Sequence, residues 1–106
     1  MTSITQIYST SNELIGFKVK GHANYSIPGR DIVCAAISAI TINTINSIKD
    51  LSIGNLDFIE DAEGNVCYKI ITKLDVVSCI LLNSALIGYQ SIAEEYSDNV
   101  VIIERR

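Results

Sequence analysis

The segment "IVCAAISAITINTINSIKDL" (Ile32–Leu51) runs for twenty residues without a glycine or a proline. Its apolar residues recur at helical spacing, which predicts one long helix. The positions expected to share the buried face are Val33, Ile37, Ile40, Thr44, Ile48 and Leu51. Ile42 and Ile45 widen this face, so we expect a helix that is either sunk in the core or shared with a partner chain.

Strand signals lie on both sides of this helix. Residues 4–8 and Leu14–Lys20 read as strands, and the polar "STSNE" between them predicts a hairpin connection. Gly54 is expected to close the helix. Beyond it, "DAEGN" separates strands at Leu56–Glu60 and residues 66–72, with Gly64-Asn65 at the turn.

The rest of the chain repeats the scheme. Residues 75–96 predict a second long helix, with Val77, Leu81, Ala85 and Gly88 on one face, and residues 100–104 a last strand. The order β-β-α-β-β-α-β predicts an α+β fold with a mostly antiparallel sheet and two long helices. At 106 residues, we expect a single domain over residues 1–106.

Composition narrows the classes of function. The net charge is −4 and no lysine- or arginine-rich run occurs, so direct nucleic-acid binding is not expected. The first residues, "MTSITQIYST", lack the features of a secretory signal, and polar residues interrupt every apolar stretch, so no membrane span is expected. Three cysteines without short spacings predict neither a disulfide framework nor a metal or other cofactor site, and favour the cytoplasm.

Cys34 stands in a chemically favourable position. Asp31 is a preferred N-cap residue, which makes Ile32 the first helical residue and places Cys34 in the first turn. There the unpaired backbone N–H groups and the helix dipole favour a negative charge, and the thiolate is the reactive form of cysteine. The alternative is a core residue, because free cysteine is among the most buried residue types.

His22 is the chain's only histidine, and it follows Gly21 at the end of a predicted strand. A histidine within hydrogen-bond reach of the Cys34 thiol could take its proton and return one to a leaving amine. The alternative is an ordinary loop histidine. Asp31 could cap the helix or orient the imidazole, and Ser38 could share the face of Cys34 or simply allow close packing.

The stretch "GHANYSIPGRDIVCAAISA" (residues 21–39) resembles the signature of the Prp family, the bacterial ribosomal-processing cysteine proteases. The matching positions are Gly21, His22, Ala23, Tyr25, Gly29, Asp31, Ile32, Val33, Cys34, Ala35, Ala36 and Ser38. The rest of the chain is similar to the family in length, element order and the closing "IAEEYSDNVVI".

The resemblance implies a thiol protease of ribosome biogenesis, with Cys34 as nucleophile, His22 as acid/base partner, and Gly21, Asp31 and Ser38 in support. The implied substrate is the N-terminal extension peptide of the large-subunit ribosomal protein numbered twenty-seven, cut after a pair of phenylalanines. The resemblance also implies a homodimer, and a segment 23–30 that closes over the substrate. From the helix position, we expect the backbone N–H of Cys34 to serve the oxyanion.

A second hypothesis belongs to another class of protein. A non-enzymatic adaptor could bind a ribosomal protein or an assembly factor without cutting it. Reactivity of Cys34 toward thiol reagents separates the two hypotheses, because an adaptor has no need of a reactive thiolate.

Overall fold

The computed structural model describes residues 1–21 and 31–105, and seven elements follow one another along them. They are β1 (Thr2–Tyr8), β2 (Leu14–Lys20), α1 (Ile32–Leu51), β3 (Leu56–Glu60), β4 (Val66–Ile70), α2 (Val76–Glu95) and β5 (Val100–Arg105). The order is the predicted one. The largest differences in bounds are that β1 begins at residue 2 rather than 4 and β4 ends at residue 70 rather than 72.

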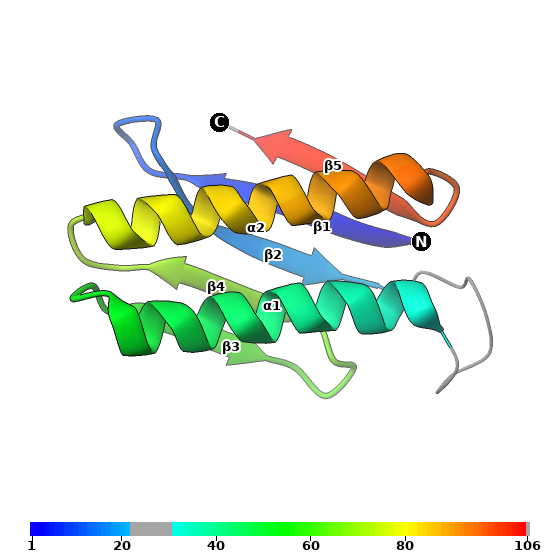
Figure 1. The fold of residues 1–106 in the computed structure, drawn as a ribbon, viewed down its shortest axis with the longest axis horizontal. Helices are drawn as coiled ribbons and strands as arrows, with labels where there is room; N and C mark the ends of the chain where they lie inside the picture. Colours follow the sequence, from blue (N-terminus) through cyan, green and yellow to red (C-terminus); the bar gives the residue numbers. More distant parts are fainter. Residues whose placement is uncertain (22–30, 106) are drawn as a thin grey trace.

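The strands form one mixed sheet in the order β3-β4-β2-β1-β5. The pairs β1–β2, β2–β4 and β3–β4 are antiparallel, whereas β5 lies parallel to β1 at the sheet edge (Figure 1). The predicted α+β fold with a mostly antiparallel sheet is therefore confirmed.

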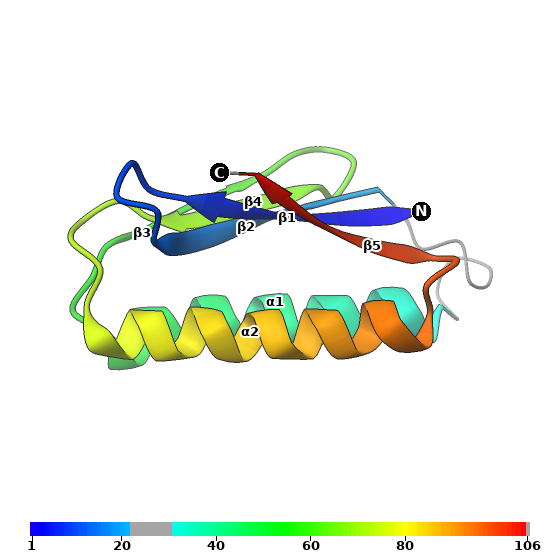
Figure 2. The ribbon, with the colours of Figure 1, turned by 90° about the horizontal axis from the view of Figure 1, so that it is seen from above.

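The molecule has two layers, because α1 and α2 lie side by side on the same face of the sheet (Figure 2). At the centre of the interface the Phe17 ring contacts those of Tyr68 and Tyr89, with centroids 5.8 and 5.0 Å away. The Tyr68 and Tyr89 hydroxyls lie 2.8 Å apart, and Thr41 Oγ1 lies 2.7 Å from the Tyr89 hydroxyl. These contacts tie the sheet to both helices through buried polar groups that are all satisfied.

The buried face expected for α1 is confirmed at Val33, Ile37, Thr44 and Ile48. The face expected for α2 is confirmed only at Ala85. In α1 the buried residues include Thr41 and Ile45, whereas Leu51 is 65% exposed. In α2 the buried residues are Ser78, Leu82, Ala85 and Tyr89. Val77 lies one position away from that face.

The apolar residues of α2 lie on more than one side of the helix, so period alone does not fix which side turns inward. Two contacts decide the orientation of α2. The large Tyr89 side chain occupies the core, and Gly88 faces Ile40 of α1, where a Cβ would lie 2.8 Å from the Ile40 Cδ1 atom.

The first helix ends at Leu51, and Ser52 is its C-cap rather than Gly54. The Ser52 hydroxyl donates to Asp75 Oδ1 at 2.8 Å and lies 2.6 Å from the Ser78 hydroxyl. Asp75 in turn is the N-cap of α2, and the hydrogen bonds from Ser78 and Ser52 lower the pKa of its carboxyl. One polar cluster thus joins the end of α1 to the start of α2.

By length and composition alone, α1 and α2 are each long and apolar enough to cross a membrane. This differs from the expectation that polar residues interrupt every apolar stretch. Core helices of soluble proteins pass the same test. Here both helices lie along the sheet, with one face buried against it (Figure 2).

Candidate active site at the start of the first helix

The first turn of α1 is fixed by Asp31, whose backbone is extended with φ −78° and ψ 102°. Its Oδ1 accepts hydrogen bonds from the N–H groups of Val33, at 2.9 Å, and Cys34, at 3.0 Å. The predicted N-cap is confirmed. Such a cap stabilises a helix by about 0.5–2 kcal/mol relative to alanine.

Cys34 is the third residue of α1, and its half-buried side chain packs against the core cluster. It lies in the first turn, as expected. Its own N–H, which was expected to serve the oxyanion, donates to Asp31 Oδ1 in this structure.

Gly21 directly follows β2, and β2 ends at the same end of the molecule at which α1 starts (Figure 1). Gly21 adopts φ +88°, and a Cβ would lie 2.5 Å from the Met1 carbonyl oxygen, so only glycine fits without a shift. His22 and the segment 23–30, which the resemblance places over the substrate, lie outside the described residues.

The turn between β3 and β4 supports this end of β2. Asn65 Oδ1 accepts the N–H of Gly21 at 2.9 Å, and the Asn65 side chain donates to Asp61 Oδ2 at 2.9 Å. The hydrogen bonds from Asn65 lower the pKa of the Asp61 carboxyl. The residue before His22 is therefore anchored to a hydrogen-bonded turn from another part of the chain.

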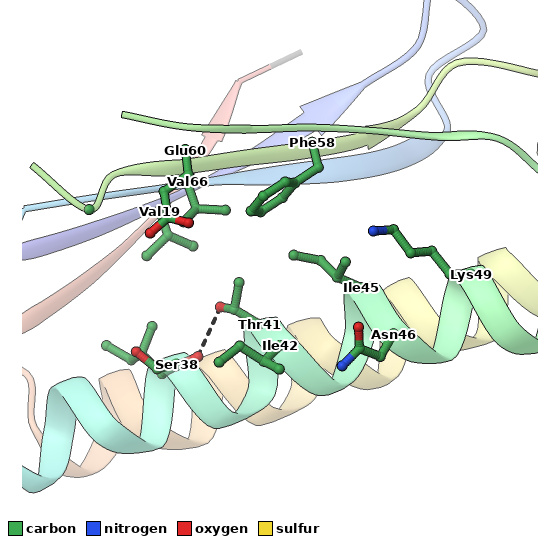
Figure 3. Close-up of a pocket in the computed structure, with 12 residues that line it drawn as sticks. Val19, Ser38, Thr41, Ile42, Ile45, Asn46, Lys49, Phe58, Glu60 and Val66 are labelled. Atoms are coloured by element: carbon green, nitrogen blue, oxygen red, sulfur yellow. Dashed lines mark hydrogen bonds between the residues drawn. The ribbon is translucent and has the colours of Figure 1, made fainter. Parts of the chain in front are cut away.

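A pocket of about 320 Å³ lies between α1 and the strands β2, β3 and β4 (Figure 3). Its lining residues are Val19, Ile37, Ser38, Thr41, Ile42, Ile45, Asn46, Lys49, Phe58, Glu60, Gly64 and Val66. Ser38 lies one helical turn after Cys34, so the pocket begins beside the predicted nucleophile. Of the supporting residues predicted from the sequence, Ser38 is the one that contributes to this pocket.

The pocket was not predicted from the sequence. Its strand wall comes from Phe58 and Val66, and its helix wall from Ile42 and Ile45, which are distant in sequence. The exposed apolar width of α1 was the one available signal, because it could have indicated a ligand surface as well as a partner chain.

The other two cysteines lie on other elements. Cys67 is on β4 and Cys79 is on α2, both half-buried, and none of the three cysteines forms a disulfide. Within residues 1–21 and 31–105, no three His, Cys, Asp or Glu side chains are grouped so that they could hold a metal ion.

Comparison with known proteins places the chain in a family. Residues 1–101 match the family described as cysteine protease Prp. The chain is 31% identical over 81 residues to the ribosomal processing cysteine protease Prp of Staphylococcus aureus strain Mu50, covering 76% of each chain. It is 27% identical over 93 residues to the protein of that name from Bacillus subtilis strain 168, covering 82% of each.

Solved structures share the fold. The ribosomal processing protease Prp of S. aureus, crystallised with a covalently linked product peptide, superposes with a TM-score of 0.92 at 24% identity, over 99% of this chain and 100% of that one. The Streptococcus mutans protein SMU.848 gives a TM-score of 0.80 at 25% identity, over 99% of this chain and 96% of that one. The match over residues 1–101 and the 31% identity to a named protease establish that this chain belongs to the cysteine protease Prp family and is a cysteine protease.

Proposed function

We propose that this cysteine protease removes the N-terminal extension of the large-subunit ribosomal protein numbered twenty-seven, with Cys34 as nucleophile and His22 as acid/base. The observation that carries the proposal is the place of Cys34. It is the cysteine in the capped first turn of α1, next to a pocket, and α1 starts at the end of the molecule at which β2 ends (Figure 1). The relatives named as ribosomal processing proteases support the choice of substrate.

In the first half of the reaction, the Cys34 thiolate attacks the carbonyl carbon of the scissile peptide bond, and a C–S bond forms. The tetrahedral intermediate then expels the amine, which takes a proton from the His22 imidazolium. The products are a free C-terminal fragment and a thioester between Cys34 and the extension. The covalently linked product peptide of the S. aureus relative supports covalent chemistry of this kind.

In the second half, water attacks the thioester carbonyl while the neutral imidazole accepts its proton. The C–S bond breaks and the extension leaves as a carboxylate. The histidine must come within about 2.6–3.2 Å of its proton-transfer partners for this role. The anchored Gly21 supports the assignment, since it fixes the chain one residue before His22.

The test is mass spectrometry of a synthetic peptide that spans the extension and its junction, incubated with the wild type and with Cys34→Ala. We expect one cut after the aromatic pair with the wild type and none with the variant. His22→Ala should reduce kcat by at least 100-fold, at the low end of what general acid–base catalysis contributes, about 10²–10⁴-fold. Its thermal unfolding should remain that of the wild type.

The chain provides matched controls, because Cys67 and Cys79 are also half-buried cysteines. Cys67→Ala and Cys79→Ala should both cleave the peptide, because Cys67 lies on a strand and Cys79 lies near the start of α2, which contributes no residue to the pocket. Loss of cleavage in either control together with activity in Cys34→Ala would move the nucleophile elsewhere. A folded wild type that binds the peptide without cutting it would instead favour the adaptor hypothesis, which membership in a protease family disfavours.

We also propose that the protein acts as a single-domain homodimer in the cytoplasm. The outer face of α2 supports the dimer, because Val76, Ile80 and Ile87 are 75%, 62% and 66% exposed there. Apolar side chains clustered on one helix face are typical of a protein–protein interface. The three reduced cysteines support a reducing compartment.

A further inference from the structure

We infer that the face of the sheet opposite the helices, which we term the open face, binds the phosphate backbone of RNA. The inference rests on four basic side chains that the strands place on this face: Lys18, Lys20, Lys69 and Arg105. The charge of the open face is independent of the proposed reaction. The choice of RNA as the partner rests on the proposed function, because an enzyme that processes a ribosomal protein meets ribosomal RNA.

Two central strands carry their lysines on the open face. Successive side chains of a strand point to opposite faces of the sheet. Phe17 and Tyr68 are fully buried on the helix side, where their rings contact each other. Lys18 follows Phe17 along β2 and therefore points the other way, as does Lys20 two positions later. Lys69 follows Tyr68 along β4 and points to the open face for the same reason.

Arg105 extends this group to the edge strand β5. It pairs with Ile7 of β1, and Ile7 pairs with Gly16 of β2. Gly16 pairs in turn with Lys69 of β4, so Arg105 and Lys69 stand in one row across the sheet. The cations come from three strands and meet only in the folded sheet, so they form no basic run that could indicate RNA binding from the sequence.

Charge is segregated between the two faces of the sheet. Of the eight lysine and arginine side chains of the chain, six lie in the described part, and four of these are on the open face. Three of the twelve carboxylate side chains belong to strands. Glu60 and Glu104 alternate to the helix side, whereas Asp57 lies on the open face opposite Lys69. The strand residues of the open face therefore have a net charge of +3 in a chain whose net charge is −4.

The four cations are available to a ligand. Both helices lie on the opposite side of the sheet (Figure 2). Lys18, Lys20 and Arg105 are exposed, and Lys69 is half-buried. Among the residues that the structure describes, none of the four forms an ion pair with a carboxylate. A phosphate at each cation would release condensed counterions from the RNA, and this release supplies most of the affinity in sequence-independent binding.

The open face offers charge but no surface on which bases could stack. The aromatic residues of the strands pack with the core or line the pocket on the helix side: Tyr8, Phe17, Phe58 and Tyr68. Proteins that read single-stranded RNA on a sheet use aromatic side chains for stacking. The open face should therefore hold the RNA backbone without preference for the RNA sequence.

The test is the salt dependence of RNA binding, measured by the anisotropy of a fluorescein-labelled RNA hairpin. The logarithm of the binding constant falls by about 0.7–0.9 per neutralised phosphate for each tenfold rise in salt, so four contacts predict a slope of about −2.8 to −3.6. Lys18→Gln with Arg105→Gln removes two of the contacts. We expect at least tenfold weaker binding at about 100 mM salt and a slope of about −1.4 to −1.8. A hairpin of unrelated sequence should give the same values.

Lys49→Gln with Lys73→Gln is the matched control. It makes the same change in net charge with two exposed lysines that lie on α1 and before α2 rather than on a strand. The control should bind RNA with the wild-type slope, and both double variants should unfold thermally as the wild type does. Equal weakening in the control would overturn the inference, because net charge rather than the open face would then govern binding.

Polyglutamate is the probe for an acidic protein as the partner. RNA should bind at least tenfold more tightly than polyglutamate, and equal binding of the two would overturn the assignment of RNA. A wild type that does not bind the hairpin at about 50 mM salt would overturn it as well, because non-specific RNA binding is strongest at low salt.

Cleavage of the free extension peptide is measured beside RNA binding. Lys18→Gln with Arg105→Gln should cut the peptide at the wild-type kcat/KM while RNA binding is weakened. If the wild type binds RNA through the open face but does not cut the peptide, the proposed reaction fails and the inference stands. If the wild type cuts the peptide but does not bind RNA, the inference is overturned and the proposed reaction stands.

Discussion

Asp31 shows how one side chain prepares a reactive residue. Its carboxylate accepts two N–H groups of the first turn, including that of Cys34, and so fixes the backbone from which the thiol projects. The thiol then lies at the positive end of a twenty-residue helix. The carboxylate thus supplies the cap, whereas the dipole at this helix end comes from the aligned peptide groups of α1.

Substitution of Asp31 separates capping from catalysis. Asp31→Ala should lower the free energy of unfolding by about 0.5–2 kcal/mol, because two N–H groups lose their acceptor. Asp31→Asn should retain most of that free energy, since asparagine caps about as well. Thermal unfolding and peptide cleavage are measured together. Lost cleavage at an unchanged melting temperature in Asp31→Asn would contradict a purely capping role.

At the scale of the elements, close backbone approach fixes how β2 meets β4. A Cβ added at Gly16 would lie 2.1 Å from the Tyr68 carbonyl oxygen and 2.6 Å from the Lys69 Cα. Both are backbone atoms of the neighbouring strand, which cannot move without breaking the ladder. The sheet therefore requires glycine at this position.

Two glycine-to-alanine variants should behave differently for this reason. Gly16→Ala should destabilise the fold by about 1–3 kcal/mol or more, as overpacking does. Gly88→Ala meets only the end of the flexible Ile40 side chain and gains helix propensity of up to about 1 kcal/mol, so its stability should stay close to that of the wild type. Urea denaturation of both variants checks the difference. An equal loss of unfolding free energy in the two variants would show that the Ile40 side chain cannot move aside.

In the whole molecule, the layer formed by α1 and α2 has an inner and an outer face, and the two faces have different roles. The inner face packs on the sheet through Phe17, Tyr68 and Tyr89. On the outer face of α2, the exposed apolar side chains have no counterpart within the described part of the chain. An inner core and an outer interface would together account for the apolar side chains on more than one side of α2.

The dimer is tested by placing charge on the outer face. Ile80→Glu with Ile87→Glu should shift the protein from dimer to monomer in sedimentation velocity, because two carboxylates would be buried without partners. Ile71→Glu is the matched control, since Ile71 is 62% exposed, as Ile80 is, but lies just after β4 rather than on α2. A monomeric wild type, or dissociation by the control alone, would contradict this interface.

The buried tyrosine pair predicts how stability depends on pH. Burial raises the pKa of Tyr68 and of Tyr89 above the usual value of about 10, so both stay protonated in the folded state while the unfolded chain ionises. The contribution of the two protonated tyrosines to the free energy of unfolding is complete below pH 10. It is lost as the pH rises above 10. Each should make the free energy of unfolding fall by about 1.4 kcal/mol per pH unit there.

Tyr68→Phe should remove one of these two contributions, so the decline above pH 10 should be less steep than in the wild type. The measurement is urea denaturation at several pH values between 8 and about 11.5. Equal slopes for the variant and the wild type would show that Tyr68 ionises as readily in the folded protein as in the unfolded chain.

The sequence by itself determined the local structure. Hydrophobic period, glycine and asparagine at turns, and the aspartate before the first helix predicted seven elements in the right order, because each signal acts over a few residues. It also determined the first-turn position of Cys34 and its cap, since both depend on where one helix begins. The family signature adjoins that same helix start, which is why a continuous stretch was enough to indicate a protease.

The tertiary structure decided what depends on contacts between distant segments. The parallel pairing of β5 with β1, the inward side of α2, and the pocket of Ile42 with Phe58 each join residues far apart in the chain. A local pattern does not encode them, because each depends on which distant segments meet. The apolar residues of α2 lie on more than one side, and in the folded protein the side that carries Tyr89 packs in the core.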